Sequence, residues 1–452
     1  MEPTQVPQLV KSLGIAFLML THIQFAAFLI GAFGLAVAAE LLGMLNPGQP
    51  SFDRFARSLG RATVILYSSG AVLAIVFILV VSLVFPTFWY TLMQISFWPL
   101  YLEAITFALT ILYLFPWYYT WDRLAGLKPV HVSMGLALIL VAQLQQGMID
   151  IQAAYMLTPT PPGDLLRLFM SPATLPLNAH RLAGDFSFAG FVVAGYAAIR
   201  ALRAREPERR AYYDWMGNLG FLAGLGFLFL QPAIGLSFLE EIRVNTPGAF
   251  NSMMRGRLSW VFLVLSGFFA LLFCLSIYYM LLQVRKSGRR GQGLISGLLV
   301  VAVLSGLLLI QPYVIGPSQD YMWIDWVNPI GAMQPWKYIA LAGLTLAALF
   351  ALFSYTGSQR RGLRWGEMGL GGRRAQYVLA FVAILTSITM LTMGYVRESS
   401  RGPYLIYYRM RIDQPERFPQ IPMTPTPPAS ASHRPPAAGA ALTSLQIGRH
   451  GP

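Results

Sequence analysis

Four ionisable side chains occur in or beside long apolar stretches of this sequence, where a lipid bilayer would exclude them. Histidine occurs in THIQFAAFLIG and LPLNAHRLAG, and glutamate occurs in FWPLYLEAITFALT and TMGYVRESSRGPY. Such a group costs several kcal/mol inside a membrane unless something binds it, so each is a candidate functional residue. Imidazole and carboxylate are ordinary ligands of metal ions and of haem iron. The four candidates are His22, Glu103, His180 and Glu398.

The composition is typical of a multi-pass membrane protein. Of the 452 residues, 56% are hydrophobic and only 12% are charged, and the mean hydropathy is +0.55. A soluble domain carries about 25% charged residues. The single cysteine, Cys274, excludes disulfides, cysteine-bound zinc and covalent haem c within this chain. The net charge of +14 does not indicate nucleic-acid binding, because the basic residues are interspersed between the apolar spans.

The sequence predicts an all-α helix bundle with ten transmembrane helices. Each apolar stretch is long enough to cross about 30 Å of hydrocarbon. Arginine and lysine gather in alternate connections, for example residues 200–210, which predicts that these connections are cytoplasmic and that both termini lie outside. No cleavable signal is expected, because the first apolar stretch is too long and lacks a cleavage site. The predicted spans are 10–44, 62–86, 93–119, 131–156, 179–202, 213–238, 258–284, 293–314, 335–356 and 376–397.

This topology places the four candidates in the outer half of the bundle. The span 10–44 enters from outside, so His22 lies roughly 18 Å below its outer end. Glu103 is expected at a similar depth, while His180 begins its span and Glu398 follows the end of the last one. Two histidines and two carboxylates at one end favour a shared metal or haem region.

Each candidate also has a simpler explanation. A lone histidine in a membrane helix can hydrogen-bond a neighbouring helix, which would account for His22 or His180. Glu398 can pair with Arg397 or Arg401 at the interface. Glu103 has fewer such explanations, because a carboxylate at that depth needs a cation, a metal or a proton.

A second polar row is predicted on the span 131–156. Gln143, Gln146 and Asp150 recur at three and four residues, so they share one helix face. This face could hold water for proton movement, and interhelical hydrogen bonding explains it equally well. Asp185, one and a half turns below His180, is either a structural partner or a proton-handling group.

Several motifs, taken in order along the chain, resemble subunit I, the catalytic subunit, of the cytochrome bd oxidases. The resemblance extends over residues 1–240 and 335–405. It implies an oxidoreductase of a respiratory chain in the cytoplasmic (inner) membrane, which reduces O2 to water together with a second, bd-type membrane subunit. The motifs are HIQFAAFLIG, FWPLYLEAITFALT, WDRL followed by KPVH, NAHRLAG, and ExxRxPY in ESSRGPY.

The resemblance also implies individual roles. His22 would be the axial ligand of the oxygen-reactive haem, with Glu103 facing it. Glu398 would ligate an adjacent high-spin haem b with help from Arg401, and His180 would ligate a low-spin haem b. The expected cofactors are therefore haem b, with haem d or a second high-spin haem b at the oxygen site.

Two single residues depart from the family pattern. The resemblance implies that the low-spin haem takes a methionine from the helix that aligns with QPWKYIALAGLTLAA, but the corresponding stretch here is Lys337, Tyr338 and Ile339, with no methionine. Met333, Met253 and Met254 are possible substitutes. A second glutamate that is frequent in the family is replaced by Ile111, so the usual proton route is altered.

The third departure is the absence of the long outer loop that binds quinol in the family. In its place lies LEEIRVNTPGAFNSMMRGRLSW, followed by additional spans. Quinol oxidation at the usual site is therefore doubtful, and a cytochrome c-like or other redox partner on the outer side is the expected donor. The chain divides into a haem-binding core (1–240), two additional helices (241–334), the last two helices (335–410) and a Pro/Ala-rich outer tail (411–452), which is either a spacer or a partner-binding segment.

Two other functions fit parts of the sequence. A haem-bearing membrane anchor could exchange electrons between quinone and an extracytoplasmic oxidoreductase, and the missing methionine and glutamate favour it. An ion-coupled transporter could use the buried carboxylates, but it would need discontinuous helices or an inverted repeat.

Overall fold

The structure is a computed structural model that describes residues 8–161, 165–255, 259–286, 291–311, 335–359 and 365–412. Ten segments within these ranges are helical, long and apolar enough to cross a membrane, which confirms the predicted all-α multi-pass bundle. The side of the membrane on which the termini lie stays a prediction. The expectations for residues 312–334, including Met333, and for residues 413–452 fall outside the described part of the chain.

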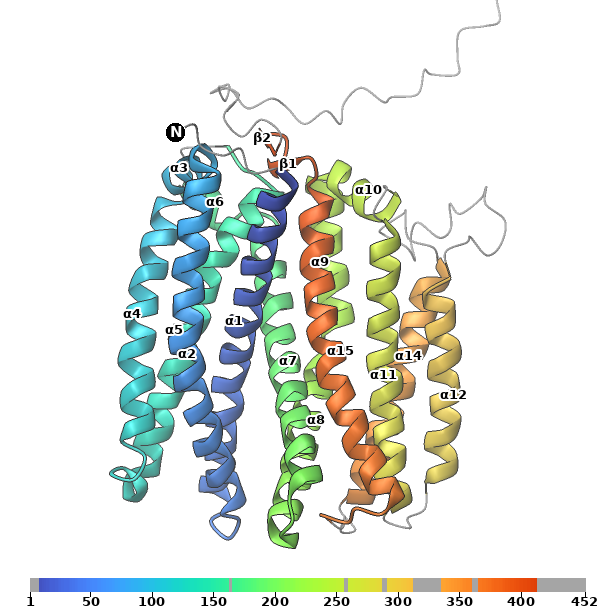
Figure 1. The fold of residues 1–452 in the computed structure, drawn as a ribbon. Coiled ribbons are helices and arrows are strands. Elements are labelled where there is room, and N and C mark those ends of the chain that lie inside the picture. Colours follow the sequence, from blue (N-terminus) through green and yellow to red (C-terminus); the bar gives the residue numbers. More distant parts are fainter. Residues whose placement is uncertain are drawn as a thin grey trace, which may run out of the picture. The chain divides into compact units, whose positions relative to one another are not determined.

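The long helices lie side by side within one compact unit (Figure 1). The shorter elements are α3 (Pro86–Ile95), η1 (Ala125–Leu127), α6 (Leu165–Phe169), α9 (Gln231–Asn245), α10 (Pro247–Arg255) and an antiparallel hairpin of β1 (Tyr404–Ile406) and β2 (Met410–Arg411). The long helices are α1 (Gln8–Leu45), α2 (Ser51–Val84), α4 (Phe97–Tyr119), α5 (Lys128–Leu157), α7 (Thr174–Arg203), α8 (Pro207–Leu228), α11 (Ser259–Lys286), α12 (Gln292–Leu309), α14 (Pro335–Gln359) and α15 (Leu370–Ser400).

The predicted span 213–238 is broken into two helices. Helix α8 ends at Leu228 and α9 begins at Gln231. Pro232 explains the break, because proline lacks a backbone N–H and its ring clashes with the preceding helical turn. The break brings α9 against α7, where Gln231 Nε2 donates to the carbonyl oxygen of His180 at 3.0 Å. Pro232 therefore helps to place the side chain of Gln231 beside His180, a candidate haem ligand.

Helices α1, α2, α4 and α5 form a closed ring. In chain order each packs against the next, and α5 returns to α1. The ring is filled by buried apolar side chains, among them Phe33, Leu114 and Leu138. Within this ring α1 and α4 stand diagonally opposite each other, so His22 and Glu103 belong to facing helices.

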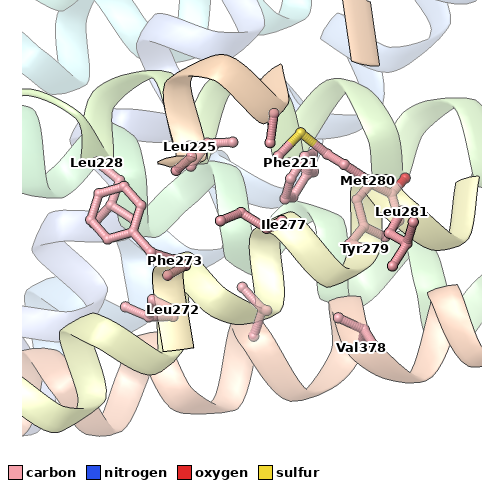
Figure 2. Packing of buried hydrophobic residues seen from close by; sticks show 14 of the residues in the cluster. Phe221, Leu225, Leu228, Leu272, Phe273, Ile277, Tyr279, Met280, Leu281 and Val378 are labelled. Carbon is pink, nitrogen blue, oxygen red and sulfur yellow. The ribbon is translucent and has the colours of Figure 1, made fainter. Parts of the chain in front are cut away.

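Helix α7 packs against α1, α8 and α15 and joins the ring to a second helix group. That group has its own core, in which Phe221 of α8, Phe273 and Ile277 of α11, and Val378 of α15 pack together (Figure 2). Helix α11 packs directly on α15, whereas α12 and α14 pack on each other and on α11. The predicted segment boundaries at 240 and 334 remain predictions.

Lys337 is buried at the contact between α14 and α12. Its ammonium group donates to the carbonyl oxygens of Leu309, at 2.8 Å, and Gln311, at 3.1 Å. These carbonyls lie at the C-terminal end of α12, where a cation is favourable. Lys337 therefore has a structural role.

We expect Lys337→Met to destabilise the protein by about 1–3 kcal/mol, because two buried acceptors lose their donor. The apparent unfolding temperature in one detergent measures the effect. Arg209→Met is the control, since the Arg209–Glu206 pair is exposed and worth less than about 1 kcal/mol. Equal unfolding temperatures for the two variants would contradict this role of Lys337.

Candidate functional site

His180 of α7 contacts the side chain of Met393 of α15. The distance from His180 Nε2 to Met393 Sδ is 3.3 Å, and His180 Nδ1 is buried without a hydrogen-bond partner. The Phe238 ring of α9 stacks beside the imidazole, with the ring centroids 6.2 Å apart. At Gly235 a Cβ would already lie 3.4 Å from His180 Cε1, so a larger side chain there would fill the space beside the ring.

Met393 places a thioether beside His180, whereas the corresponding stretch of α14 has no methionine. Histidine with methionine is an ordinary axial pair for haem iron. Because the two atoms are in direct contact, an iron bound by both would have to part them. The chemistry of the pair and the unpartnered Nδ1 therefore fit a haem at His180.

The methionines proposed from the sequence lie elsewhere. Met253 is buried beside Val396 and Tyr407, and Met254 packs against the same cluster. Ile339, in the corresponding stretch of α14, is 59% exposed. Met393 was not predicted from the sequence, because the resemblance points to α14 for the methionine, although Met393 lies only five residues before Glu398.

His22 and Glu103 approach the same turn of α2. The ring of His22 interacts with the backbone of Gly70, and its Nδ1 is buried without a hydrogen-bond partner. Glu103 acts electrostatically on the hydroxyl group of Tyr67, three residues earlier on α2. No hydrogen bond or ion pair joins His22 to Glu103 in the described structure. The two groups thus border one region from opposite helices.

Glu103 is held by Gln145 of α5, a residue that sequence reasoning missed. Gln145 Nε2 donates to Glu103 Oε1 at 3.4 Å, and Thr110 Oγ1 donates to Gln145 Oε1 at 3.1 Å. Gln145 is visible in the same polar stretch as Gln143 and Gln146. Its side chain contacts α4, whereas the row formed by Gln143 and Asp150 contacts α7. Ile111, at the position of the family's second glutamate, packs against the apolar core of the ring.

Glu398 is paired with arginine on both sides. Arg397 donates to its Oε1 at 2.8 Å, and Arg401 donates to its Oε2. Arg401 is buried and also donates to the carbonyl oxygen of Leu405 at 2.5 Å, which fixes the β1–β2 hairpin to α15. This is the ion pairing that the sequence offered as the simpler explanation. Each carboxylate oxygen of Glu398 accepts one arginine hydrogen bond in these contacts and keeps a further lone pair.

The polar row of α5 faces α7, a neighbour that its spacing did not identify. Gln143 Nε2 donates to Asn178 Oδ1 at 3.1 Å, and Asn178 Nδ2 donates to Asp150 Oδ2 at 2.9 Å. Arg181 completes an ion pair with the fully buried Asp150. The buried Gln146 lies beside Asp185. The described contacts hold Asp150 in an ion pair, and its predicted proton role stays a prediction.

A buried cluster near the opposite end of the ring was also missed. His131 Nδ1 lies 2.5 Å from Glu40 Oε1, and His131 Nε2 lies 2.6 Å from the carbonyl oxygen of Trp117. A carbonyl can only accept, so Nε2 carries a hydrogen, and the other ring nitrogen faces the Glu40 carboxyl group. Trp117 Nε1 donates to Glu40 Oε2 at 3.3 Å. The cluster links α1, α4 and α5.

The ligand chemistry favours haem over a bare metal ion. In the described part of the chain, no three His, Cys, Asp or Glu side chains are grouped so that they could hold a metal ion. A structural zinc ion needs about four protein ligands, whereas haem iron needs only one or two axial ones. Isolated histidines, one of them beside a thioether, therefore suit haem iron.

The fold and these residues define a helical membrane protein with partly buried imidazole, thioether and carboxylate groups between its helices. Residues 12–255, more than half of the chain, match the family described as cytochrome bd terminal oxidase subunit I. The chain belongs to that family, which confirms the resemblance predicted from the motifs. At this general level it is an oxidoreductase, a terminal oxidase subunit of membrane electron transport.

Among solved structures, the bd oxidase from Geobacillus thermodenitrificans is similar to this chain. The sequence identity is 15%, the TM-score is 0.50, and the match covers 87% of this chain and 98% of that chain. At this identity the likeness concerns the fold. No curated protein sequence matched the chain.

Proposed function

We propose that this chain binds haem and reduces O2 to water as the catalytic subunit of a cytochrome bd-type oxygen reductase in the cytoplasmic membrane. One observation carries the proposal beyond family membership, namely the contact between His180 and Met393. In this proposal the two side chains, which come from helices far apart in the sequence, are the axial pair of a low-spin haem. The stretch of α14 that resembles the family's methionine-bearing helix has no methionine.

The chain's own residues have separate tasks in this proposal. His180 and Met393 hold the low-spin haem b that receives electrons, and His22 holds the haem at which oxygen reacts. Glu398, with Arg401 beside it, holds a further high-spin haem b. The bound haems supply electron storage and the iron that binds oxygen.

Glu103 handles protons at the oxygen site. Gln145 holds its Oε1, so the carboxyl group keeps one orientation inside the ring. A carboxylate close to the reacting centre can accept a proton and pass it on. Its electrostatic effect on Tyr67, one helical turn from the Gly70 backbone that His22 contacts, suits that task.

Electrons enter from the outer side in this proposal, and a second, bd-type membrane subunit completes the complex. The connection between α9 and α11 contains only the short helix α10 and few other residues. It is too short to be the family's quinol-binding loop. We therefore propose a cytochrome c-like or other redox protein as the donor.

Oxygen consumption by the purified complex tests this function. We expect uptake with reduced cytochrome c, little uptake with quinol, and none in either case after His22→Ala. Asp122→Ala, which changes an exposed surface residue, should leave the rate unchanged. A complex that contains haem but consumes no oxygen with either donor would instead support the membrane electron-transfer anchor.

A further inference from the structure

Asp185 of α7 is a buried carboxylate that the arrangement above does not use. The residue is 4% exposed, and its Oδ2 has no hydrogen-bond partner. Gln146 of α5, also 4% exposed, is a hydrogen-bonding neighbour of the Asp185 side chain. The carboxyl oxygen that stays without a partner, Oδ2, can be satisfied by water or by a proton.

The charged groups around Asp185 balance if one of the carboxyl groups binds a proton. Arg181 on its own helix and Asp150 on α5 are the charged groups that act on it in the described structure. Arg181 is already paired with Asp150, which also accepts from Asn178. Two carboxylates therefore face one guanidinium group, and a neutral cluster requires that one carboxyl group is protonated. Asp185 is that group, because Asp150 holds the ion pair.

The position of Asp185 suits proton delivery to the His22 site. A Cβ at Gly31 of α1 would lie 2.2 Å from the backbone oxygen of Asp185, so the two helices touch at this level. Gly31 follows His22 by nine residues, or roughly 13 Å along the helix. Asp185 therefore lies on the predicted cytoplasmic side of His22, and Arg181 interacts electrostatically with both residues.

We propose that Asp185, with Gln146, forms the proton-binding site that supplies the His22 region in this chain. The proposal rests on the proposed oxygen reduction. Asp185 on α7 would then replace the proton-carrying glutamate that the resemblance predicts on α4. At that position α4 has Ile111, whose side chain packs against the apolar core. The proton binds at Oδ2 of Asp185, and when it leaves for the His22 region the ionised carboxylate stays beside Arg181.

Infrared spectroscopy of the complete complex in lipid, with isotopically labelled aspartate, tests the proposal without turnover. We expect one carbonyl band of a protonated aspartic acid that titrates with pH and disappears in Asp185→Asn. The band should persist in Asp122→Asn, because that carboxylate is exposed and paired with Arg57. If the wild-type complex has no such band, or if Asp185→Asn retains it, the proposal is wrong.

Two further variants keep the test decisive if Asp185→Asn does not assemble. The band should shift in Asp185→Glu, because the acid changes, and in Gln146→Leu, because its polar neighbour is lost. A band that is unchanged in both would overturn the assignment.

Oxygen consumption separates this proposal from the proposed function. We expect Asp185→Asn to lower the rate by roughly 100-fold or more and Asp185→Glu to restore most of it. An active wild-type complex with an equally active Asp185→Asn variant would refute the proton site and leave the proposed function standing. An inactive wild-type complex that still contains haem would refute both.

Discussion

We expect His180→Ala to remove one haem from the purified complex. The imidazole is the axial ligand that the proposal gives to the low-spin haem, and Met393 alone is a weak ligand. The pyridine haemochrome content per chain and the visible spectrum measure the loss. The unfolding temperature of the same preparation shows whether the helices still pack.

Met393→Leu tests the new member of the pair separately. The haem should remain bound through His180, but it should become high-spin and its reduction potential should fall, because thioether ligation raises the potential. Met280→Leu is the matched control, since Met280 is fully buried in the core of α8, α11 and α15 (Figure 2). A low-spin spectrum and an unchanged potential in Met393→Leu would show that Met393 is not a ligand.

We expect Asp214→Ala to be the most destabilising substitution outside the haem sites. Asp214 is fully buried and accepts from Lys286 Nζ at 2.6 Å, Gln376 Nε2 at 2.7 Å and the backbone N–H of Gly366 at 2.9 Å. It therefore joins α8, α11 and α15. Removing one partner of a buried ion pair costs about 3–5 kcal/mol, because the other charge stays buried.

The unfolding temperature of the complex in one detergent measures this cost. Asp122→Ala is the matched control, because the Arg57–Asp122 pair has half-exposed to exposed side chains and contributes less than about 1 kcal/mol. If Asp214→Ala and Asp122→Ala unfold at the same temperature, Asp214 does not have this structural role.

The helices could be predicted from the sequence because the bilayer imposes a simple requirement. A transmembrane helix needs about 20 apolar residues, and that signal is local. All ten predicted spans correspond to helical segments of the structure. The break at Gln231 was missed, although Pro232 is visible in the sequence, because the apolar signal continues across it.

The partners of the polar residues could not be predicted in the same way. A spacing of three and four placed Gln143, Gln146 and Asp150 on one face, but it could not show that the face meets Arg181. Which side chains meet across two helices depends on the rotation and depth of both. Met393 was missed for that reason, and the contact of Gln145 with Glu103 was missed for the same reason.

The burial of His131 and Glu40 could not be predicted from the sequence either. Each residue lies near the end of an apolar span, close to charged residues of a connection. Their sequence context is therefore the same as that of residues at a solvated helix end. Only the packing of α1 against α5 shows that both are buried.

A reduced-minus-oxidised absorption spectrum of the purified complex, with a carbon monoxide difference spectrum, tests haem-based oxygen reduction most directly. The proposal predicts at least two haems, of which one is low-spin and one binds carbon monoxide. Low-spin haem that does not react with carbon monoxide would contradict the oxygen site at His22. A complex without haem would contradict the proposed function as a whole.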